Sequence, residues 1–501
     1  MSRPARVLVV GGGISGLAAA YRLTRLAPAA AVTIVESDRR LGGKILTERR
    51  DGFVIEGGPD SFLSSKPGAL ELCRELGLED RLRGTRDETR RTFVLRRGRL
   101  LEIPEGLSGL VPTRLGPLLR SPLFSLPGKL RMGLELLLPP RRGGEDEALA
   151  AFITRRLGRE AYERLIEPLM AGIYAGDGAR LSLEATFPQL RDLERLHGGL
   201  LRGLLRRGPA AAMSDAGPAG TPSGGPRARG PQAAARPAPL PPFLTLAGGL
   251  EDLVWTLSSR LAEAEIRLGA GAEELQRSPG GYTLRLGGGE TLTADAVILA
   301  APAHVSAGLT ERLDPELGAA LRAIPHVSTA TVTLAWPRGG VPHPLDGYGY
   351  IVPRAEGRPV LACTWTSSKF PHRAPEGQAL IRVFIGRDAG SATAPVDSLG
   401  DEDLLRLARD EVRDILGIGA PPALARLFRW PQGMPQYTLG HTQRLAAMEA
   451  RLARLPGLSM AGNFLRGVGL PDCIRSGEAA AARAAGHLES AQPARHATGR
   501  S

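Results

Sequence analysis

Aromatic residues are scarce in this chain: phenylalanine, tryptophan and tyrosine together make up 4% of its 501 residues. Proteins that bind single-stranded nucleic acid stack the bases on aromatic side chains, so we expect no nucleic-acid partner. Cysteine is also rare, and Cys73, Cys363 and Cys473 are too far apart to form a CxxC or a cysteine–histidine cluster. The sequence therefore predicts no metal site, and its few cysteines indicate a cytoplasmic protein with reduced thiols.

Long apolar runs and an export signal are missing as well. No stretch of about 18 apolar residues is present, which is the length that a membrane-spanning helix requires. The first residues enter an apolar strand pattern directly, without the charged leader and apolar core of a signal peptide. Lysine is rare, so the formal charge of +12 comes almost wholly from arginine. Three interpretations of this charge stay open: general solubility, steering of an acidic substrate, and attraction to an anionic membrane surface.

The clearest positive feature is a glycine-rich turn near the start of the chain. An apolar run at 7–10 leads into this turn, and a helical pattern rich in alanine and leucine follows it. A second apolar run at 32–35 ends at Glu36, twenty residues after Gly16. This order of strand, glycine turn, helix, strand and acid is typical of a dinucleotide-binding site. The residues of the turn predicted to contact the cofactor are Gly11, Gly12, Gly13, Ile14, Ser15 and Gly16.

Each residue type in this motif has a physical reason. Gly11 permits the tight turn, Gly13 lets a pyrophosphate approach the backbone, and Gly16 lets the helix pack closely on the strand. The N-terminus of the helix then presents unpaired N–H groups and the positive end of its dipole to the phosphates. Glu36 can accept hydrogen bonds from ribose hydroxyls, and its charge would repel a 2′-phosphate. A chance glycine-rich turn is the alternative, which the flanking strands, helix and acid make the weaker one.

Two further turns are predicted to lie against the ring of a flavin. In 55–62 a strand pattern ends in a rigid turn whose N–H groups could donate to the flavin edge; its predicted contacts are Gly57, Gly58, Pro59 and Asp60. In 461–472 a final strand enters another glycine-rich turn, and the following helix would direct its positive dipole end at the flavin. An ordinary structural turn remains the alternative for each segment. The other predicted cofactor contacts are Ser37, Arg40, Gly43, Lys44, Ala272, Trp430, Gly462, Asn463, Val468, Gly469 and Leu470.

Other catalytic motifs are not found. No second GxGxxG opens a strand–helix–strand unit, so a separate NAD(P)H-binding domain is not expected. No GxSxG nucleophile motif stands out, and the histidines have no triad or metal spacing, so no catalytic side chain is predicted. An enzyme built in this way should take electrons from an organic substrate and pass them to oxygen or to a mobile acceptor.

Together these stretches make the chain resemble the porphyrinogen oxidase family of flavoproteins, within the amine oxidase superfamily. The resemblance covers nearly the whole chain except 208–242 and the final tail. The segments that carry it are 41–44 (LGGK), 56–62 (EGGPDSF), 167–177 (EPLMAGIYAGD), 183–188, 430–437 and 469–473.

The resemblance implies FAD as the cofactor and a helical domain that in some family members meets the membrane. It implies a step of haem biosynthesis, the six-electron oxidation of a porphyrinogen with three O₂ consumed and three H₂O₂ released. The stretches 172–177 and 185–188 favour coproporphyrinogen III over protoporphyrinogen IX as the substrate. Peripheral contact with the inner face of the membrane and a hand-off to the downstream haem-pathway enzyme are further expectations.

The chemistry of such a substrate explains why no acid–base pair stands out. Hydride loss from a meso carbon leaves a delocalised cation whose pyrrole N–H is acidic, so no strong protein base is required. Positioning that carbon against flavin N5 and excluding water should supply most of the catalysis. Carboxylates on the macrocycle need cations, for which Arg90, Arg91 and Arg96 are candidates, with Arg91 first.

Two other classes of function stay open. One is an amine oxidase or carotenoid desaturase on the same scaffold, which the absence of an aromatic neighbour beside Cys473 disfavours. The other is a flavin-bound interaction or haem-delivery protein, which intact turns at both cofactor edges argue against.

Composition and periodicity predict an α/β fold: a Rossmann-like FAD-binding domain built from discontinuous segments, with an inserted α+β substrate domain and a helical subdomain. Segment 208–242 is rich in alanine, proline and glycine and has too little apolar bulk to fold, so it is predicted to be a flexible insertion. The predicted segments are 1–103, 243–310 and 426–490 for the FAD-binding domain, 104–207 for the helical subdomain with a substrate or membrane-facing role, 311–425 for an antiparallel substrate sheet, and 491–501 for a flexible tail.

Overall fold

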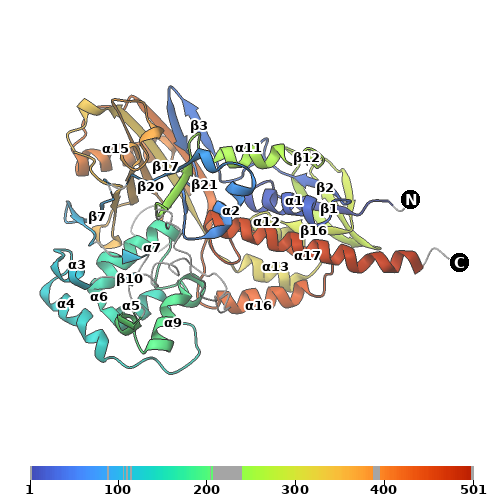
Figure 1. Ribbon diagram of the computed structural model, residues 1–501, viewed down its shortest axis with the longest axis horizontal. Helices are drawn as coiled ribbons and strands as arrows, with labels where there is room; N and C mark the ends of the chain where they lie inside the picture. Colours follow the sequence, from blue (N-terminus) through green and yellow to red (C-terminus); the bar gives the residue numbers. More distant parts are fainter. Residues whose placement is uncertain are drawn as a thin grey trace, which may run out of the picture.

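The computed structural model describes residues 3–497 apart from positions 87, 89, 105–106, 109–110, 113–114, 204, 207–239 and 388–394. Three parts are visible in Figure 1: an α/β part that carries both ends of the chain, a part built on a large sheet, and a helical part below that sheet in this view. Each part combines segments that are distant in the sequence.

A five-stranded parallel sheet forms the centre of the α/β part. Its strands, in spatial order, are β12 (Glu265–Arg267), β2 (Ala31–Val35), β1 (Arg6–Val10), β16 (Ala296–Leu299) and β22 (Leu458–Met460). The apolar runs of β1 and β16 are buried because elements cover both faces of the sheet. Since β1, β16 and β22 are neighbours, three distant segments bring their carboxyl ends to one edge.

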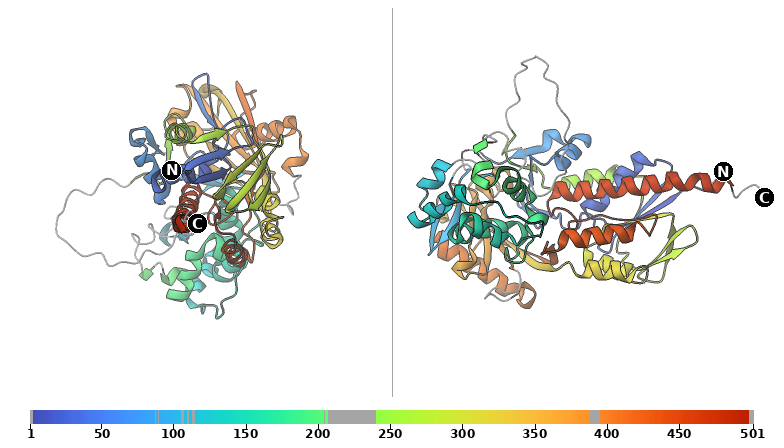
Figure 2. Two further views of the ribbon diagram at one scale, coloured as in Figure 1. Left: turned by 90° about the vertical axis from the view of Figure 1, so that its right-hand side faces the viewer. Right: turned by 90° about the horizontal axis from the view of Figure 1, so that it is seen from below.

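Helices cover one face of this sheet, and a mixed layer covers the other. On the first face lie α1 (Ile14–Leu26), α2 (Pro67–Glu75), α11 (Glu251–Ser259) and α17 (Leu470–Ala497). The second face carries β13 (Ala272–Ser278), β14 (Gly281–Leu286), β15 (Thr291–Ala294), α12 (Ala303–Thr310), α13 (Pro315–Arg322) and α16 (His441–Leu452). Figure 2 shows α17 running the length of this three-layer part.

A seven-stranded sheet forms the second part, and α15 (Asp401–Leu416) packs on one of its faces. Its strands, in spatial order, are β21 (Leu424–Pro435), β17 (His326–Pro337), β20 (Gln378–Ile385), β19 (Val360–Trp365), β18 (Gly349–Ile351), β7 (Thr92–Arg96) and β8 (Arg99–Glu102). All neighbours are antiparallel except β18 and β7. The sheet therefore takes strands from the predicted segments 1–103 and 426–490 as well as from 311–425.

Short strand groups link these two parts. They are the hairpin of β3 (Thr47–Arg50) with β4 (Phe53–Glu56), and a three-stranded group of β5 (Phe62–Leu63), β11 (Phe243–Leu246) and β6 (Leu82–Gly84). The hairpin β3–β4 leads directly into the predicted flavin turn at Gly57.

The third part consists mainly of short helices around a core of its own. Its elements are β9 (Leu107–Ser108), β10 (Val111–Pro112), α3 (Leu115–Arg120), α4 (Leu126–Gly133), α5 (Leu149–Leu157), α6 (Arg159–Ala161), α7 (Glu167–Tyr174), α8 (Leu183–Thr186) and α9 (Pro188–His197). None of the helices that the structure describes is long and apolar enough to cross a membrane. The predicted insertion falls almost entirely outside the described residues, since only 240–242 are described, and of the predicted tail only 491–497 are described.

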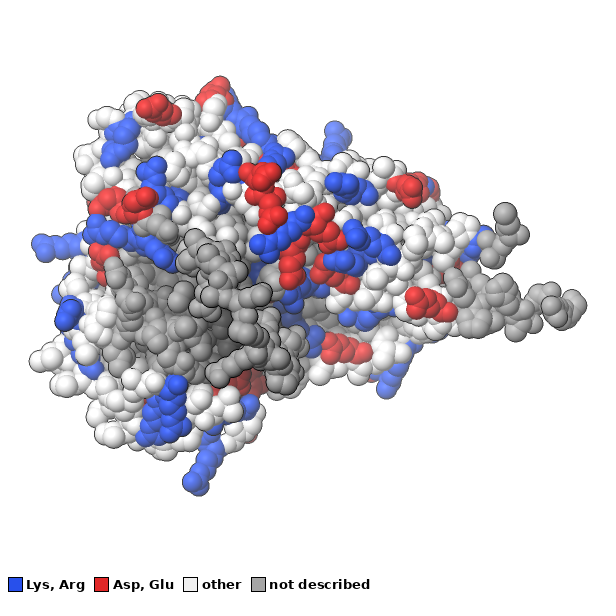
Figure 3. Space-filling model, in the orientation of Figure 1, with Lys and Arg blue, Asp and Glu red and all other residues white. Residues whose placement is uncertain are grey.

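Charges of both signs are interspersed on the surface. On the face in Figure 3, basic and acidic side chains lie next to one another over the α/β part rather than in separate fields. Arg22, for example, binds both Glu75 and Glu478. On this face the arrangement favours solubility over electrostatic steering as the use of the positive charge.

Candidate functional site

The first glycine-rich turn has the backbone that its sequence predicts. Gly11 has a φ of +112°, and a Cβ at this position would lie 2.8 Å from the carbonyl oxygen of Ala300. A Cβ on Gly16 would lie 1.9 Å from the Gly11 carbonyl oxygen. Only glycine fits at either position, and α1 therefore begins in direct contact with the turn that precedes it.

Gly13 lies at the open N-terminus of α1. It is the N-cap residue, no side chain caps the helix, and the first turn contains no acid. Of the atoms that the structure describes, a Cβ on Gly13 would have only the Gly43 Cα within 4 Å, at 3.9 Å. An uncapped N-terminus with free space above it fits an anionic group such as a pyrophosphate.

Glu36 lies at the carboxyl end of β2, beside the same turn. Its Oε2 accepts a hydrogen bond from the Gly12 N–H (2.7 Å), and its Oε1 accepts from the Asp38 N–H (2.8 Å) and the Ser37 hydroxyl (3.1 Å). The Ala270 N–H donates to the Glu36 carbonyl (2.8 Å), so the start of β13 at Ala272 lies nearby. The structure thus gathers the predicted ribose-side residues at one place.

Arg40 shapes the loop that faces this turn. Its guanidinium donates to the carbonyls of Leu41 (3.2 Å), Gly43 (2.5 Å) and Ile45 (2.9 Å). The loop is also tied to the turn, because the Gly42 N–H donates to the Gly12 carbonyl (2.8 Å). These contacts show that Arg40 supports the loop. A contact between Arg40 and the cofactor stays a prediction.

The second predicted turn is tightly held from several sides. A Cβ on Gly58 would lie 1.7 Å from the Lys44 carbonyl oxygen, and one on Gly57 would lie 2.8 Å from the Phe428 ring. The Gly57 carbonyl accepts hydrogen bonds from the Trp430 indole (2.9 Å) and from two other side chains. The structure therefore joins Lys44 and the turn to Trp430, which lies hundreds of residues further along the chain.

Charged groups flank this turn. Asp60 accepts hydrogen bonds from Lys369 Nζ (3.1 Å) and from the Ser61 hydroxyl (2.7 Å). Burial alone would raise the pKa of Asp60, but the positive charges of Lys369 and Arg382 outweigh it and hold that pKa well below its usual range. Burial lowers the pKa of Lys44. The turn is therefore surrounded by buried charges on the protein side.

The third predicted turn follows β22 and is fixed by two ring side chains. The Tyr437 hydroxyl donates to the Asn463 carbonyl (2.5 Å), and His441 Nε2 donates to the Leu465 carbonyl (3.0 Å). The two rings stack with their centroids 4.2 Å apart. Burial lowers the pKa of His441 to about 4, so the ring is neutral at pH 7 and keeps one N–H for this contact.

The helix that follows the third turn begins at Leu470. Asp472, in its first turn, forms an ion pair with Lys66 (2.6 Å), and a Cβ on Gly467 would lie 2.4 Å from the Asp472 carboxyl carbon. Burial raises the pKa of Asp472, and Lys66 opposes that shift. Because Lys66 directly precedes α2, this ion pair ties the start of α17 to the start of α2.

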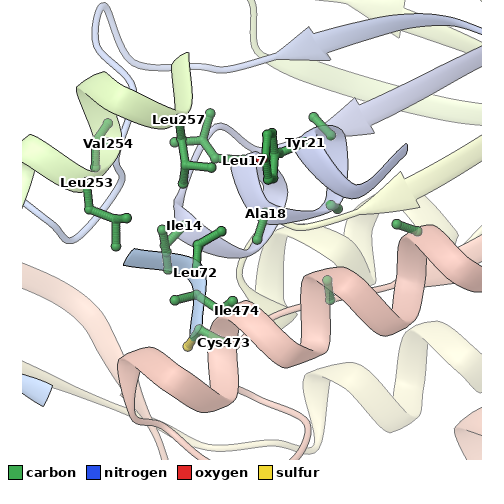
Figure 4. Close-up of a cluster of buried hydrophobic side chains, with 14 of the residues drawn as sticks. Ile14, Leu17, Ala18, Tyr21, Leu72, Leu253, Val254, Leu257, Cys473 and Ile474 are labelled. Carbon is green, nitrogen blue, oxygen red and sulfur yellow. The ribbon is translucent and has the colours of Figure 1, made fainter. Parts of the chain in front are cut away.

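Helices α1 and α17 bring the first and third turns together. A Cβ on Gly477 would lie 2.1 Å from the Ser15 carbonyl oxygen, so the two helices are in backbone contact. Figure 4 shows Ile14 of α1 above Cys473 and Ile474 of α17, with Leu72 of α2 between them. Both helices thus start at the same end of the pair. The first and third turns therefore lie at the carboxyl edge of the parallel sheet, and Lys44 joins the second turn to the loop in which Gly43 contacts Gly13.

Arg91 is placed differently from the rest. It donates to Glu102 (3.0 Å) and to Asp346 (2.5 Å), and its side chain is 45% exposed at the edge of the seven-stranded sheet. Its guanidinium binds two carboxylates of the protein, and its contact with substrate stays a prediction. Tyr437, His441, Thr331 and Arg382, which hold the turns, were not predicted, because nothing in their sequence spacing relates them to those turns.

Comparison with known proteins identifies relatives of this chain. The family model described as flavin containing amine oxidoreductase matches residues 14–485. The chain is 36% identical to a coproporphyrinogen III oxidase of Bacillus subtilis over 96% of this chain and 98% of that protein. It is 39% identical to a coproporphyrinogen III oxidase of Propionibacterium freudenreichii over 93% of this chain and 88% of that protein.

Solved structures share the fold. The crystal structure of a candidate protoporphyrinogen oxidase from Exiguobacterium sp. 255-15 is 33% identical, with a TM-score of 0.80 over 98% of this chain and 100% of that one. These matches confirm the α/β fold with a Rossmann-like domain, and they confirm the resemblance on which FAD was expected. The protein is a flavin-dependent oxidoreductase that uses FAD, and it belongs to the porphyrinogen oxidase family within the flavin-containing amine oxidoreductases.

Proposed function

We propose that this protein oxidises coproporphyrinogen III to coproporphyrin III, with O₂ as the final electron acceptor and H₂O₂ as its product. One observation carries the proposal: three turns suited to a flavin nucleotide meet in a chain that matches two bacterial coproporphyrinogen III oxidases almost from end to end. Bound FAD supplies the hydride acceptor. The residues of this chain supply binding, orientation and exclusion of water.

Each turn has a proposed part in holding the cofactor. The open N-terminus of α1 at Gly13 faces the pyrophosphate, and Glu36 accepts hydrogen bonds from the ribose. The turn at Gly57 and the turn before Leu470 hold opposite edges of the ring. No side chain need act as a strong base, because the cation left by hydride loss is delocalised and its pyrrole N–H is acidic.

Reduction of the flavin under anaerobic conditions tests this function. Holoenzyme mixed with coproporphyrinogen III without O₂ should lose its yellow absorbance, and admission of air should restore it with release of H₂O₂. An unchanged spectrum would favour a flavin-bound carrier instead. Bleaching by a primary amine and not by the porphyrinogen would favour an amine oxidase.

Protoporphyrinogen IX is the second candidate substrate, supported by the Exiguobacterium structure and its 33% identity. The two candidates differ in two side groups of the macrocycle, which are propionates in coproporphyrinogen III and vinyls in protoporphyrinogen IX. The kcat/KM values for both, measured on one preparation, decide between them. A higher value for protoporphyrinogen IX would overturn the preference proposed here.

The helical part carries an apolar face that fits peripheral contact with the inner face of the membrane. Its exposed side chains, with their exposed fractions, are Leu119 (54%), Leu126 (71%), Leu130 (66%), Leu134 (51%) and Leu137 (76%). An exposed apolar cluster interspersed with Arg120 and Lys129 suits an anionic bilayer surface. We propose a cytoplasmic protein that binds there reversibly.

Sedimentation with vesicles containing phosphatidylglycerol tests this contact. The double variant Leu126→Gln/Leu130→Gln should sediment less than the wild type. The control Leu196→Gln, an equally exposed leucine on α9, should behave as the wild type does. Equal sedimentation of all three proteins would contradict the proposal.

A hand-off of the porphyrin to the downstream haem-pathway enzyme is the remaining proposal about partners. It is supported by the chemistry of the product, a flat ring with a large apolar surface. Transfer faster than release of free porphyrin into solution, measured by stopped-flow fluorescence with that enzyme, would support it. Transfer at the rate of free release would refute it.

A further inference from the structure

The carbonyl oxygen of Gly57 accepts hydrogen bonds from three side chains on three neighbouring strands. The donors are Thr331 Oγ1 of β17 (2.9 Å), the Trp430 indole N–H of β21 (2.9 Å) and Arg382 Nη2 of β20 (3.1 Å). A carbonyl oxygen has two lone pairs, so three donors saturate it. Hydrogen bonds to one end of a peptide group polarise the whole group and strengthen the donor at its other end. That donor is the N–H of Gly58.

Arg382 is the charged member of this set. Its side chain is 3% exposed, and its Nη2 donates to both the Gly57 carbonyl and the Gly58 carbonyl (2.5 Å). Within the part of the chain that the structure describes, it has no direct ion pair, and its Nε and Nη1 have no hydrogen-bond partner. Asp60 and Glu56 attract it only through space. The hydrogen bonds of this buried charge therefore go to the two carbonyls of the turn, while its guanidinium also lies over the Phe384 ring, 4.7 Å from the centroid. Hydrogen bonds from a charged donor are roughly twice as strong as neutral ones.

The Gly58 N–H is the donor that this arrangement leaves available. The Gly57 N–H donates to the Leu46 carbonyl (2.7 Å), and Pro59 has no N–H. Among the described residues, no acceptor takes the Gly58 N–H. The Lys44 carbonyl blocks one side of Gly58, so the turn cannot shift toward Lys44.

We propose that Arg382 and Thr331 are positioning residues that hold and polarise the Gly57–Gly58 peptide, which makes the Gly58 N–H a strong donor to a carbonyl edge of the flavin ring. This inference rests on the proposed place of the turn at the flavin. Uptake of a hydride brings two electrons and one proton to the ring and adds one negative charge to it. A stronger donor at a carbonyl edge therefore favours the reduced ring over the oxidised one and raises the two-electron potential.

A pair of matched substitutions in β17 tests the neutral donor. Thr331→Val removes a hydroxyl that binds the Gly57 carbonyl. Thr333→Val, at an equally buried position of the same strand, removes a hydroxyl that has no hydrogen-bond partner among the described residues. Dye equilibration of the holoenzymes measures the potential. In the Thr331→Val protein the equilibrium ratio of reduced to oxidised flavin should fall about threefold. Because a factor of ten corresponds to about 30 mV for a two-electron couple, the potential should fall by about 15 mV. Thr333→Val should leave the potential unchanged.

Substitution of the arginine tests the charged donor. Arg382→Met should lower the same preference about tenfold, which is about 30 mV, and Arg382→Lys should give a smaller fall. The control is Arg387→Met, because Arg387 is also buried but binds Glu167 and the carbonyls of Val352 and Val360. It should not move the potential. If the Arg382 variants do not fold, the threonine pair decides.

The outcomes separate this inference from the proposed function. Equal potentials for wild type, Thr331→Val and Thr333→Val would overturn the inference, as would the same shift in both threonine variants. The proposed function would survive that result if these proteins were still bleached by coproporphyrinogen III. A protein that is not bleached by it would instead refute the function, whatever the potentials.

Discussion

Substitution of Gly13 gives the sharpest test of where the pyrophosphate binds. Within the described part of the chain, a Cβ at this position has only the Gly43 Cα within 4 Å, at 3.9 Å, so there is room for a small side chain. Gly13→Asp places a carboxylate over the open N-terminus of α1, where the phosphates are proposed to lie. Two unit charges about 4 Å apart repel by about 4 kcal/mol at the effective dielectric constant of a protein surface, which weakens FAD binding about a thousandfold.

The assay is the dissociation constant of FAD, measured by the quenching of flavin fluorescence as it binds the apoprotein. Gly13→Ala is the matched control, because it adds a Cβ without a charge and should bind FAD within about tenfold of the wild type. Circular dichroism and the melting temperature of both apoproteins should equal those of the wild type, which shows that the fold is intact. The difference in FAD affinity between the Asp and Ala variants then gives the effect of the charge. Stoichiometric FAD in purified Gly13→Asp protein would refute this placement of the pyrophosphate.

The remaining predictions concern packing, pH and the insertion. Gly16→Ala should prevent accumulation of soluble folded protein, because its Cβ would lie 1.9 Å from the Gly11 carbonyl oxygen; a soluble holoenzyme with wild-type melting temperature would contradict this. Asp60 has a pKa held below its unfolded value of about 3.9, so its contribution to the free energy of unfolding is present above that pH and is lost as the pH falls through the lower folded value. Lys369→Met should reduce the fall in the free energy of unfolding that urea titrations measure from about pH 5, about one unit above the unfolded pKa, down to the lowest pH at which the protein folds. An unchanged dependence of that free energy on pH would refute this. Deletion of 208–239 should leave kcat near that of the wild type; it keeps Pro242, whose carbonyl accepts a hydrogen bond from the Ser64 N–H. A folded but inactive product would show that the segment has a function.

Several features were predictable because their causes are local. The glycines at 11 and 16 follow from the geometry of a turn between a strand and a helix, and the structure shows the close approaches that exclude any side chain there. Helix α15 also has local causes, because apolar side chains repeat with helical spacing over its length and acids occupy its first turn. The resemblance to porphyrinogen oxidases rested on short motifs of this local kind, and the comparisons confirmed it.

The supports of the site could not be predicted. Tyr437 and His441 reach the third turn through a ring stack, and their four-residue spacing is that of any helix turn. Arg91 was the first candidate for a contact with the substrate carboxylates, and the sequence could not show that the folded chain pairs it with Glu102 and Asp346. The domain segments of the prediction ended near the hairpin at 92–102, whereas β7 and β8 pair with β18 and with each other in the large sheet.

The amino-acid order by itself determined the three glycine-rich turns, the acid after β2 and the family, because backbone conformation and short motifs depend on residues within a few positions. Only the tertiary structure decided that these turns meet and what holds them. Thr331, Arg382 and Trp430 reach one carbonyl because β21, β17 and β20 are neighbours in register, and that pairing results from the burial of the whole sheet rather than from any spacing along the chain.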